Sequence, residues 1–312
     1  MDSIPATRTE ELSPAPRELS PRARGMLIVG AGVLIMSFDA LLVRLAETSI
    51  WNVAFWRGLF IALSLWSFQA LRLRGRLGAT IRAGGLPLLG IGVIMGCGSL
   101  SIVSSFTLTL AANTVVILSA APLVAAVLSR VLLGERCRPR TWAAILTAMA
   151  GVWIVVSGSV GEGNLLGDVL AVAATIFMGT YLTLLRRYPD ISRLLVVGLG
   201  GFCMALAAVW FAEPFSLPPG TYGVLALMGL VQMPSALALV TTGTRYLPSP
   251  EVGLFLLGET ILSPIWVGIA LGEVPGIPTL AGGILILLAL AANACLALRE
   301  QAPVAASPPE SP

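Results

Sequence analysis

Two charged side chains occur deep within long apolar stretches of the sequence. Asp39 lies in the stretch 26–46, and Arg57 lies six residues into the stretch 51–71. The turn between the stretches is centred near residues 48–49, so the two side chains are almost equally far from it. If the stretches form an antiparallel helical hairpin, Asp39 and Arg57 lie at a similar depth and within reach of a salt bridge.

This pair has two interpretations, and the sequence leaves both open. In the first, Asp39 and Arg57 form a structural ion pair that holds the hairpin together. In the second, the planar guanidinium of Arg57 binds a ligand carboxylate in bidentate geometry, while Asp39 binds an amine or a proton. Ionisable groups at membrane depth are functional candidates by default, because the surrounding hydrocarbon makes them costly.

A third charge at this depth is Glu259, in the middle of the apolar stretch 250–271. A carboxyl group away from water can bind and release a proton near neutral pH. Glu259 is therefore the second candidate, after Asp39, for a group with this role. Arg44 lies closer to the end of its stretch and one turn from Glu47. We therefore expect Arg44 to extend toward the membrane surface and to pair with Glu47.

Uncharged residues complete the set of candidates for a ligand site. Trp56 and Tyr181 lie deeper in their stretches than most aromatic residues of the chain, and they are candidates for lining an apolar pocket. Gln232 and Ser235 place polar side chains on either side of Pro234, in the middle of the stretch 221–243.

Pro122, Pro234 and Pro264 lie in the interior of apolar stretches, well away from their ends. Proline frees a backbone carbonyl and kinks a helix. Each of the three is therefore either a gating hinge or a static kink that shapes a cavity.

Other residues of this kind have structural explanations. Glu251 follows a Ser-Pro pair at a predicted helix start, where an acid stabilises the helix end, and Asp168 is expected to do the same. Gly92 and Gly96 are spaced as a close-packing helix face.

Ten apolar stretches must position these residues. A hydrophobic fraction of 56%, a charged fraction of 11% and a mean hydropathy of +0.91 lie far outside the range of soluble domains. Stretches of about 20 residues match a hydrocarbon core of ~30 Å. The stretches are 26–46, 51–71, 85–106, 112–133, 141–157, 166–185, 194–212, 221–243, 250–271 and 279–298. The sequence therefore predicts an all-α integral membrane protein with ten transmembrane helices.

All nineteen basic residues are arginines, and they keep to one side of these stretches. They precede the first stretch, follow the last, and occupy or flank even-numbered gaps, with Arg44 and Arg57 as the exceptions. The odd-numbered gaps contain none: 47–50, 107–111, 158–165, 213–220 and 272–278. Because arginine-rich short loops stay cytoplasmic, both the N and the C terminus are predicted to be cytoplasmic.

Residues 1–24 and 299–312 are polar or rich in proline and are expected to be disordered cytoplasmic tails. The chain has no histidine, and its four cysteines are scattered, so we expect no metal site and no cofactor. Without a nucleophile–base or metal constellation, enzyme activity is not expected. The net charge of +3 does not indicate a nucleic-acid partner, because the distribution of the arginines is explained by the orientation of the helices in the membrane.

The tripeptide Leu-Gly-Glu ends two of the stretches, at residues 133–135 and 271–273, and a Thr and an Ala beyond it recur at the same offset of 138 residues. This recurrence divides the chain into a first repeat, 25–157, and a second repeat, 166–298. Five stretches per repeat is an odd number, so the two copies must insert with opposite orientation. We expect the glutamates of both tripeptides to be interfacial and structural.

Pro122 and Pro264 lie upstream of the two Gly-Glu pairs, and the second stretch contains the run Ala-Phe-Trp-Arg-Gly at 54–58. Together with ten stretches in two five-helix repeats, these features resemble the EamA group of the drug/metabolite transporter superfamily over about residues 25–298. The resemblance implies a basket of helices around a central cavity, with the fifth and tenth helices at its periphery. One departure is the run Met-Ser-Phe-Asp at 36–39, where relatives often carry Trp-Gly.

Characterised members of that group export amino acids and other small metabolites. The resemblance therefore implies a secondary active transporter of the cytoplasmic (inner) membrane. It would export small metabolites, such as aromatic or other apolar amino acids, by alternating access. The expected partners are a small-molecule substrate, the lipid bilayer and protons, for a monomer or a homodimer. A facilitator or uniporter, an exporter of drugs (organic cations) with the same fold, and a non-transporting sensor or scaffold are the alternatives.

Overall fold

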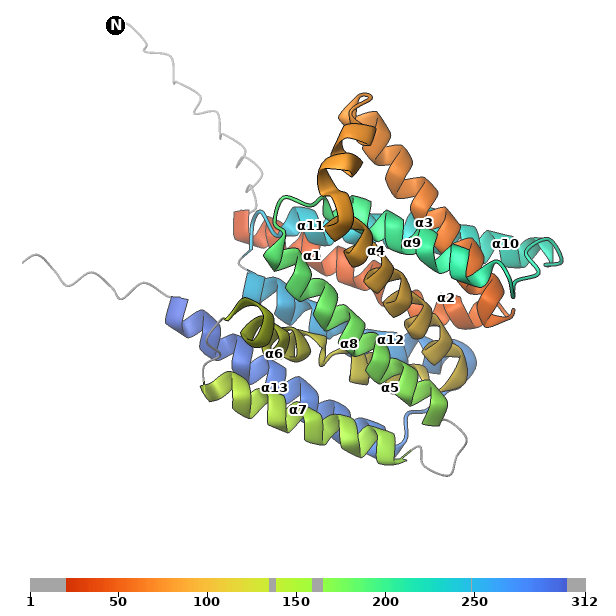
Figure 1. Ribbon diagram of the computed structural model, residues 1–312. Helices are drawn as coiled ribbons and strands as arrows, with labels where there is room; N and C mark the ends of the chain where they lie inside the picture. The colour runs from red at the N-terminus through yellow and green to blue at the C-terminus, as the bar shows by residue number, and fades with distance from the viewer. Residues whose placement is uncertain (1–20, 135–138, 159–164, 248, 302–312) are drawn as a thin grey trace, which may run out of the picture.

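The structure, a computed structural model, describes four parts of the chain: residues 21–134, 139–158, 165–247 and 249–301. Every regular element within these parts is a helix (Figure 1). Most of the two predicted tails lies outside the described residues. The first helix begins at Pro21 and the last ends at Gln301, so both run a few residues into the predicted tails.

Helices cover the apolar stretches of both repeats. The first repeat contains α1 (Pro21–Met36), α2 (Asp39–Leu45), α3 (Ile50–Leu73), α4 (Leu77–Leu108), α5 (Ala111–Leu118), α6 (Ala121–Leu133) and α7 (Pro139–Gly158). The second contains α8 (Leu165–Arg187), α9 (Arg193–Ala208), α10 (Pro219–Ala226), the π-helical segment η1 (Leu227–Gln232), α11 (Met233–Gly243), α12 (Ser249–Leu271) and α13 (Ile277–Gln301).

Most of these helical segments are long and apolar enough to cross a membrane. Eight qualify within the described residues: Pro21–Leu45, Ile50–Leu73, Leu77–Leu108, Ala111–Leu133, Thr141–Gly158, Leu165–Arg187, Pro219–Gly243 and Ile277–Leu296. Two shorter apolar helices, Arg193–Ala208 and Phe255–Leu271, accompany them. The chain therefore has the architecture of a multi-pass membrane protein.

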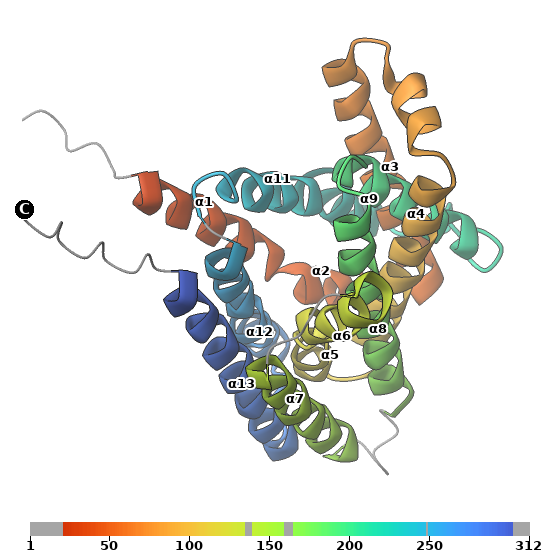
Figure 2. The ribbon, with the colours of Figure 1, turned by 60° about the vertical axis from the view of Figure 1, so that its left-hand side comes forward.

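The two repeats pack against each other through matching pairs of helices. In the first repeat α1 lies along α11 of the second, and the corresponding helix of the second repeat, α8, lies along α4 of the first. Two further pairs are formed by corresponding helices: α3 with α9, and α7 with α13 at one side of the molecule (Figure 2). This exchange of partners is the contact pattern expected of two structurally equivalent five-helix repeats.

Glycine lets α9 approach its neighbours at backbone distance. A Cβ atom at Gly201 would lie 2.7 Å from the carbonyl oxygen of Gly58 on α3, and one at Gly96 on α4 would lie 2.9 Å from the carbonyl oxygen of Gly200. A Cβ atom at Gly92 would meet Leu199 of α9. The predicted close-packing face of Gly92 and Gly96 is thus confirmed, and its partner is α9.

The repeats differ in where their helices are interrupted. The span Pro21–Leu45 breaks between α1 and α2 at Ser37 and Phe38, and the span Ala111–Leu133 breaks between α5 and α6. The corresponding helices of the second repeat, α8 and α12, are continuous. These two breaks lie in the first repeat, where α4 is also kinked at Gly85, whereas the second repeat has the π-helical segment η1 between α10 and α11.

The three prolines have different local effects. Pro122 lies in the first turn of α6, directly after a break, because its ring displaces the carbonyl four residues earlier, at the end of α5. Pro234 lies in the first turn of α11, directly after the π-helical segment η1. Pro264 lies inside α12, which continues through it without interruption.

We predict that Gly201→Ala destabilises the protein by roughly 1–3 kcal/mol, because the added methyl group overlaps the backbone of α3. The measurement is the thermal unfolding temperature of the purified protein in detergent. Gly90→Ala is the matched control, since a Cβ atom at Gly90 meets nothing within 4 Å. Equal unfolding temperatures for the two variants would contradict the packing described here.

Candidate functional site

The buried ion pair of Asp39 and Arg57 connects the first two helical spans. Arg57 on α3 donates a hydrogen bond from Nη2 to Oδ2 of Asp39, at the start of α2, over 2.9 Å. The side chains are only 5% and 8% exposed, respectively. The salt bridge that the hairpin geometry predicted between Asp39 and Arg57 is therefore present in the structure.

Each member of this pair keeps one polar atom without a partner. Oδ1 of Asp39 and Nη1 of Arg57 are buried and accept or donate no hydrogen bond within the described residues. A buried ion pair offsets its desolvation only when hydrogen bonds satisfy its remaining donors and acceptors. The pair is thus incompletely satisfied, which is costly for a purely structural contact.

Asp39 follows the break in the first span, and the second repeat supplies groups that hold this break. Gln232 of η1 donates from Nε2 to the backbone carbonyls of Ile35 (3.2 Å) and Met36 (3.4 Å). These carbonyls lie at the C-terminal end of α1, where helical partners are lost. Oε1 of Gln232 is buried and has no partner in the described part of the chain.

Trp266 of α12 holds the same break from another side. Its indole N–H donates to the hydroxyl of Ser37 over 2.9 Å, and its ring stacks on Phe38 with a centroid distance of 4.8 Å. Trp266 and Gln232 therefore connect two helical segments of the second repeat, α12 and η1, to the four residues that precede Asp39.

Glu259 lies close enough to Asp39 and Arg57 for both charges to act on it. It is in the middle of α12, and it is partly exposed, unlike either member of the ion pair. Within the described residues Glu259 makes no hydrogen bond and no ion pair. The structure thus brings Asp39, Arg57 and Glu259 into one neighbourhood, in which Glu259 is the member without a hydrogen-bond or ion-pair partner among the described residues.

The other candidates from the sequence have side chains engaged elsewhere. The indole N–H of Trp56 donates to the carbonyl of Pro214 over 2.9 Å, in the connection between α9 and α10. Tyr181 is buried among apolar residues of α4, α8 and α9, and it lines a small, largely apolar pocket between α4 and α8 that is separate from the ion pair. The hydroxyl of Ser235 donates to backbone carbonyls of its own helix, among them that of Gln232 over 3.1 Å.

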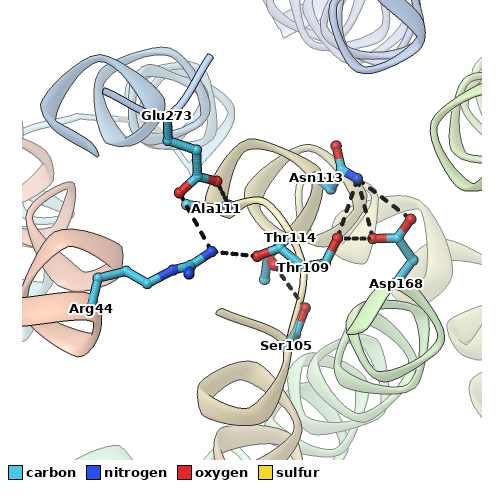
Figure 3. Close-up of polar contacts among 8 residues, drawn as sticks. All are labelled: Arg44, Ser105, Thr109, Ala111, Asn113, Thr114, Asp168 and Glu273. Atoms are coloured by element: carbon cyan, nitrogen blue, oxygen red, sulfur yellow. Dashed lines mark hydrogen bonds and ion pairs between the residues drawn. The ribbon is translucent and has the colours of Figure 1, made fainter. Parts of the chain in front are cut away.

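A second polar cluster, in which Arg44 meets the second repeat, lies near the C-terminal ends of α2 and α4 and the start of α5 (Figure 3). Arg44 pairs with Glu273 over 3.4 Å and donates to the carbonyl of Thr109 over 2.6 Å. The expected pair of Arg44 with Glu47 is therefore wrong, because the guanidinium extends across the molecule instead of along its own helix. Glu273 also accepts the backbone N–H of Ala111 over 2.7 Å and so caps α5.

The same cluster contains a buried carboxylate, Asp168, near the start of α8. The hydroxyl of Thr109 donates to it over 2.7 Å, and the side-chain amide of Asn113 donates over 3.3 Å (Figure 3). Thr279 of α13 in turn donates to the side-chain oxygen of Asn113. Asp168 lies in the first helical turn, as predicted, but it also connects the repeats.

Glu251 likewise lies in the first turn of its helix, α12, as predicted. Arg22 of α1 donates to it over 2.7 Å, in an ion pair between the repeats that the sequence did not indicate. Arg22 precedes the first apolar stretch, so this contact lies at the end of the spans opposite to Arg44. The glutamate of the first Leu-Gly-Glu tripeptide, Glu135, lies outside the described residues.

Trp266, Thr109 and Asn113 were not among the candidates from the sequence. Thr109 and Asn113 are four residues apart, which places both on one face of a helix start; this spacing was the available signal. Trp266 is one uncharged residue in an apolar stretch, and its role depends on a break in a distant helix.

Comparison with known proteins agrees with this architecture. The model of the EamA-like transporter family matches residues 23–157 and 165–294. The uncharacterized transporter YwfM of Bacillus subtilis (strain 168) is 28% identical over 188 residues, which cover 52% of this chain and 62% of the relative. The chain therefore matches less than two thirds of that relative's length.

A solved structure, named only as the crystal structure of a protein, has the same fold. The match covers 90% of this chain and 99% of the solved one, with a TM-score of 0.63 and 20% sequence identity. At this identity the likeness concerns the fold alone.

We predict that Asp39→Leu destabilises the protein more than Arg57→Leu, and that the double variant is more stable than Asp39→Leu alone. Removing one partner of a buried ion pair typically costs about 3–5 kcal/mol. A carboxyl group left alone can be neutralised by a proton, whereas a guanidinium keeps its charge. Unfolding temperatures of all four proteins in detergent form a double-mutant cycle; strictly additive effects would contradict the ion pair.

We predict that Glu273→Ala destabilises the protein by roughly 1–3 kcal/mol, because it removes both the partner of Arg44 and the cap on Ala111. Glu47→Ala is the control and is expected to change stability by less than about 0.5 kcal/mol. Thermal unfolding in detergent distinguishes the two. A larger effect at Glu47 would restore the pairing expected from the sequence.

Proposed function

The chain belongs to the EamA-like transporter family, and from this premise we propose that it is a secondary transporter that exports small metabolites, amino acids first among them. Because the family consists of membrane transporters, the protein is a membrane transporter and not an enzyme. The export of amino acids and the mechanism below are our proposal. We place the protein in the cytoplasmic (inner) membrane.

The proposed topology has ten membrane spans with both termini in the cytoplasm. Eight helices are long and apolar enough to span, and the proposal adds the two shorter ones, α9 and the apolar part of α12. Support comes from the arginines, which lie before and in the first turn of α1, at and just beyond the C-terminal ends of α3 and α8, and not in the alternate connections.

Transport proceeds by alternating access, in which the two repeats move against each other. The polar contacts between the repeats at the two ends of the spans support this mechanism. Arg44 pairs with Glu273 at the outer end, and Arg22 pairs with Glu251 at the cytoplasmic end. Each set of contacts has to separate for its side to open, and polar contacts can exchange for water when they do.

Protons drive export through the acidic groups at the centre. The observation that carries this part is the buried, incompletely satisfied pair of Asp39 and Arg57 beside the accessible Glu259. A carboxylate that loses its partner at this depth becomes neutral most readily by binding a proton. Asp39 and Glu259 are therefore the proposed proton carriers. The release of protons from these two residues depends on the positions of both repeats.

The proposal predicts that Asp39→Asn loses export driven by a pH gradient, by at least tenfold, while it remains folded. The measurement is counterflow and pH-driven flux in proteoliposomes, with a panel of amino acids, organic cations and nucleotide sugars. Glu47→Gln, an acid outside the central cluster, is the control and should retain wild-type flux.

Three results would separate the alternatives. Full retention of pH-driven export in Asp39→Asn would exclude Asp39 as the coupling site. Counterflow without any response to a pH gradient in the wild-type protein would indicate a facilitator. Transport of no member of the panel would contradict the proposed function.

A further inference from the structure

The three charged groups at the centre, Asp39, Arg57 and Glu259, differ in their exposure and in the partners that they already have. Arg57 is 5% exposed and already donates to Asp39, which is 8% exposed. A substrate carboxylate could meet only the unpartnered Nη1 of Arg57, next to the contact with Asp39, and it would have to enter a space closed to solvent. Glu259, by contrast, is partly exposed and has no hydrogen-bond or ion-pair partner in the part of the chain that the structure describes.

The balance of charge at this point is negative once Glu259 has released its proton. Two carboxylates, Asp39 and Glu259, face one guanidinium, that of Arg57. The contact between Asp39 and Arg57 accounts for one charge of each sign. The negative charge of Glu259 then has no positive counterpart. The unpartnered Oδ1 of Asp39 adds a second buried acceptor beside it. Nη1 of Arg57 is an unpartnered donor at the same place, but it belongs to the one guanidinium already counted, so a ligand with a positive charge would balance the three groups.

Aromatic rings lie on the same face of α12 as Glu259. Phe255 precedes it by one turn and Trp266 follows it by two, so helical geometry places the three within about 40° of one another. The ring of Phe255 lies 3.8 Å from the position of a Cβ atom at Gly30, and Trp266 stacks on Phe38. This face is therefore turned toward α1 and the break that follows it.

We propose that the substrate is recognised through a protonated amine at Glu259, and that Arg57 does not bind a substrate carboxylate. The substrate class is that of primary amines with an apolar body, in which amino acids are included but their carboxylate is not required. Glu259 supplies the counter-charge, and the neighbouring aromatic rings favour a cation with apolar substituents. This inference rests on the proposed transport function and narrows it.

The test compares competitors that differ only in the group recognised. For the amino acid that shows the strongest counterflow, one competitor is the decarboxylated amine and the other is the N-acetylated amino acid. We expect the amine to inhibit counterflow about as well as the parent amino acid. We expect the N-acetyl derivative to inhibit at least tenfold less. Stronger inhibition by the N-acetyl derivative would overturn the inference and restore Arg57 as the ligand, with transport itself intact.

Variants at Glu259 assign the effect to this side chain. Glu259→Gln should weaken inhibition by the amine at least tenfold, whereas Glu259→Asp keeps the charge and should keep part of the effect. Glu47→Gln is the control. Unfolding temperatures show that each variant is folded, and unchanged inhibition in folded Glu259→Gln would overturn the assignment.

Binding of an amine series to the purified protein separates this inference from the proposed function. Phenethylamine and its alkyl analogues are the probes, measured by tryptophan fluorescence, with and without the Glu259→Gln change. If no amino acid is transported but these amines bind in a way that depends on Glu259, amino-acid export fails and the inference stands. If neither occurs, both fail.

Discussion

The ion pair between Asp39 and Arg57 is the contact on which the rest of the site depends. Two charges at this depth persist only because they meet, and they meet at the point where the first span is broken. That break is held by Gln232 and Trp266, which belong to the second repeat. The environment of the ion pair therefore changes whenever one repeat moves relative to the other. In the proposed mechanism, this connects a conformational change to a change in protonation.

The interface between the repeats is built from two kinds of contact. Where α9 lies against α3 and α4, glycines bring the backbones together, and such close packing tolerates little displacement. At the two ends the contacts are polar, as in the pairs of Arg44 with Glu273 and Arg22 with Glu251. An interface with a close-packed part and polar, exchangeable ends is suited to opening at one end at a time. The breaks of the first repeat are absent from the corresponding helices α8 and α12, whereas the irregular backbone of the second repeat is the π-helical segment η1.

Much of this arrangement follows from the sequence because it depends on local patterns. The apolar stretches, the close-packing face of Gly92 and Gly96 and the depth of Asp39 and Arg57 could all be predicted from spacing along single helices. The partner of Arg44 could not be predicted in this way. Its long side chain lies near a helix end and can reach either Glu47 or Glu273, which is more than two hundred positions away in the sequence. The break at Ser37 and Phe38 has no proline or glycine to signal it, and depends on side chains of α12 and η1 instead.

The central claim is that one group of acids handles both substrate and protons, and it is tested most directly by proton release on binding. The measurement adds substrate to purified protein in weakly buffered detergent solution and records the pH. We predict that close to one proton leaves per protein molecule, and that release is lost in folded Glu259→Gln. Binding of the same substrate without proton release, or with release unchanged by that variant, would contradict the account.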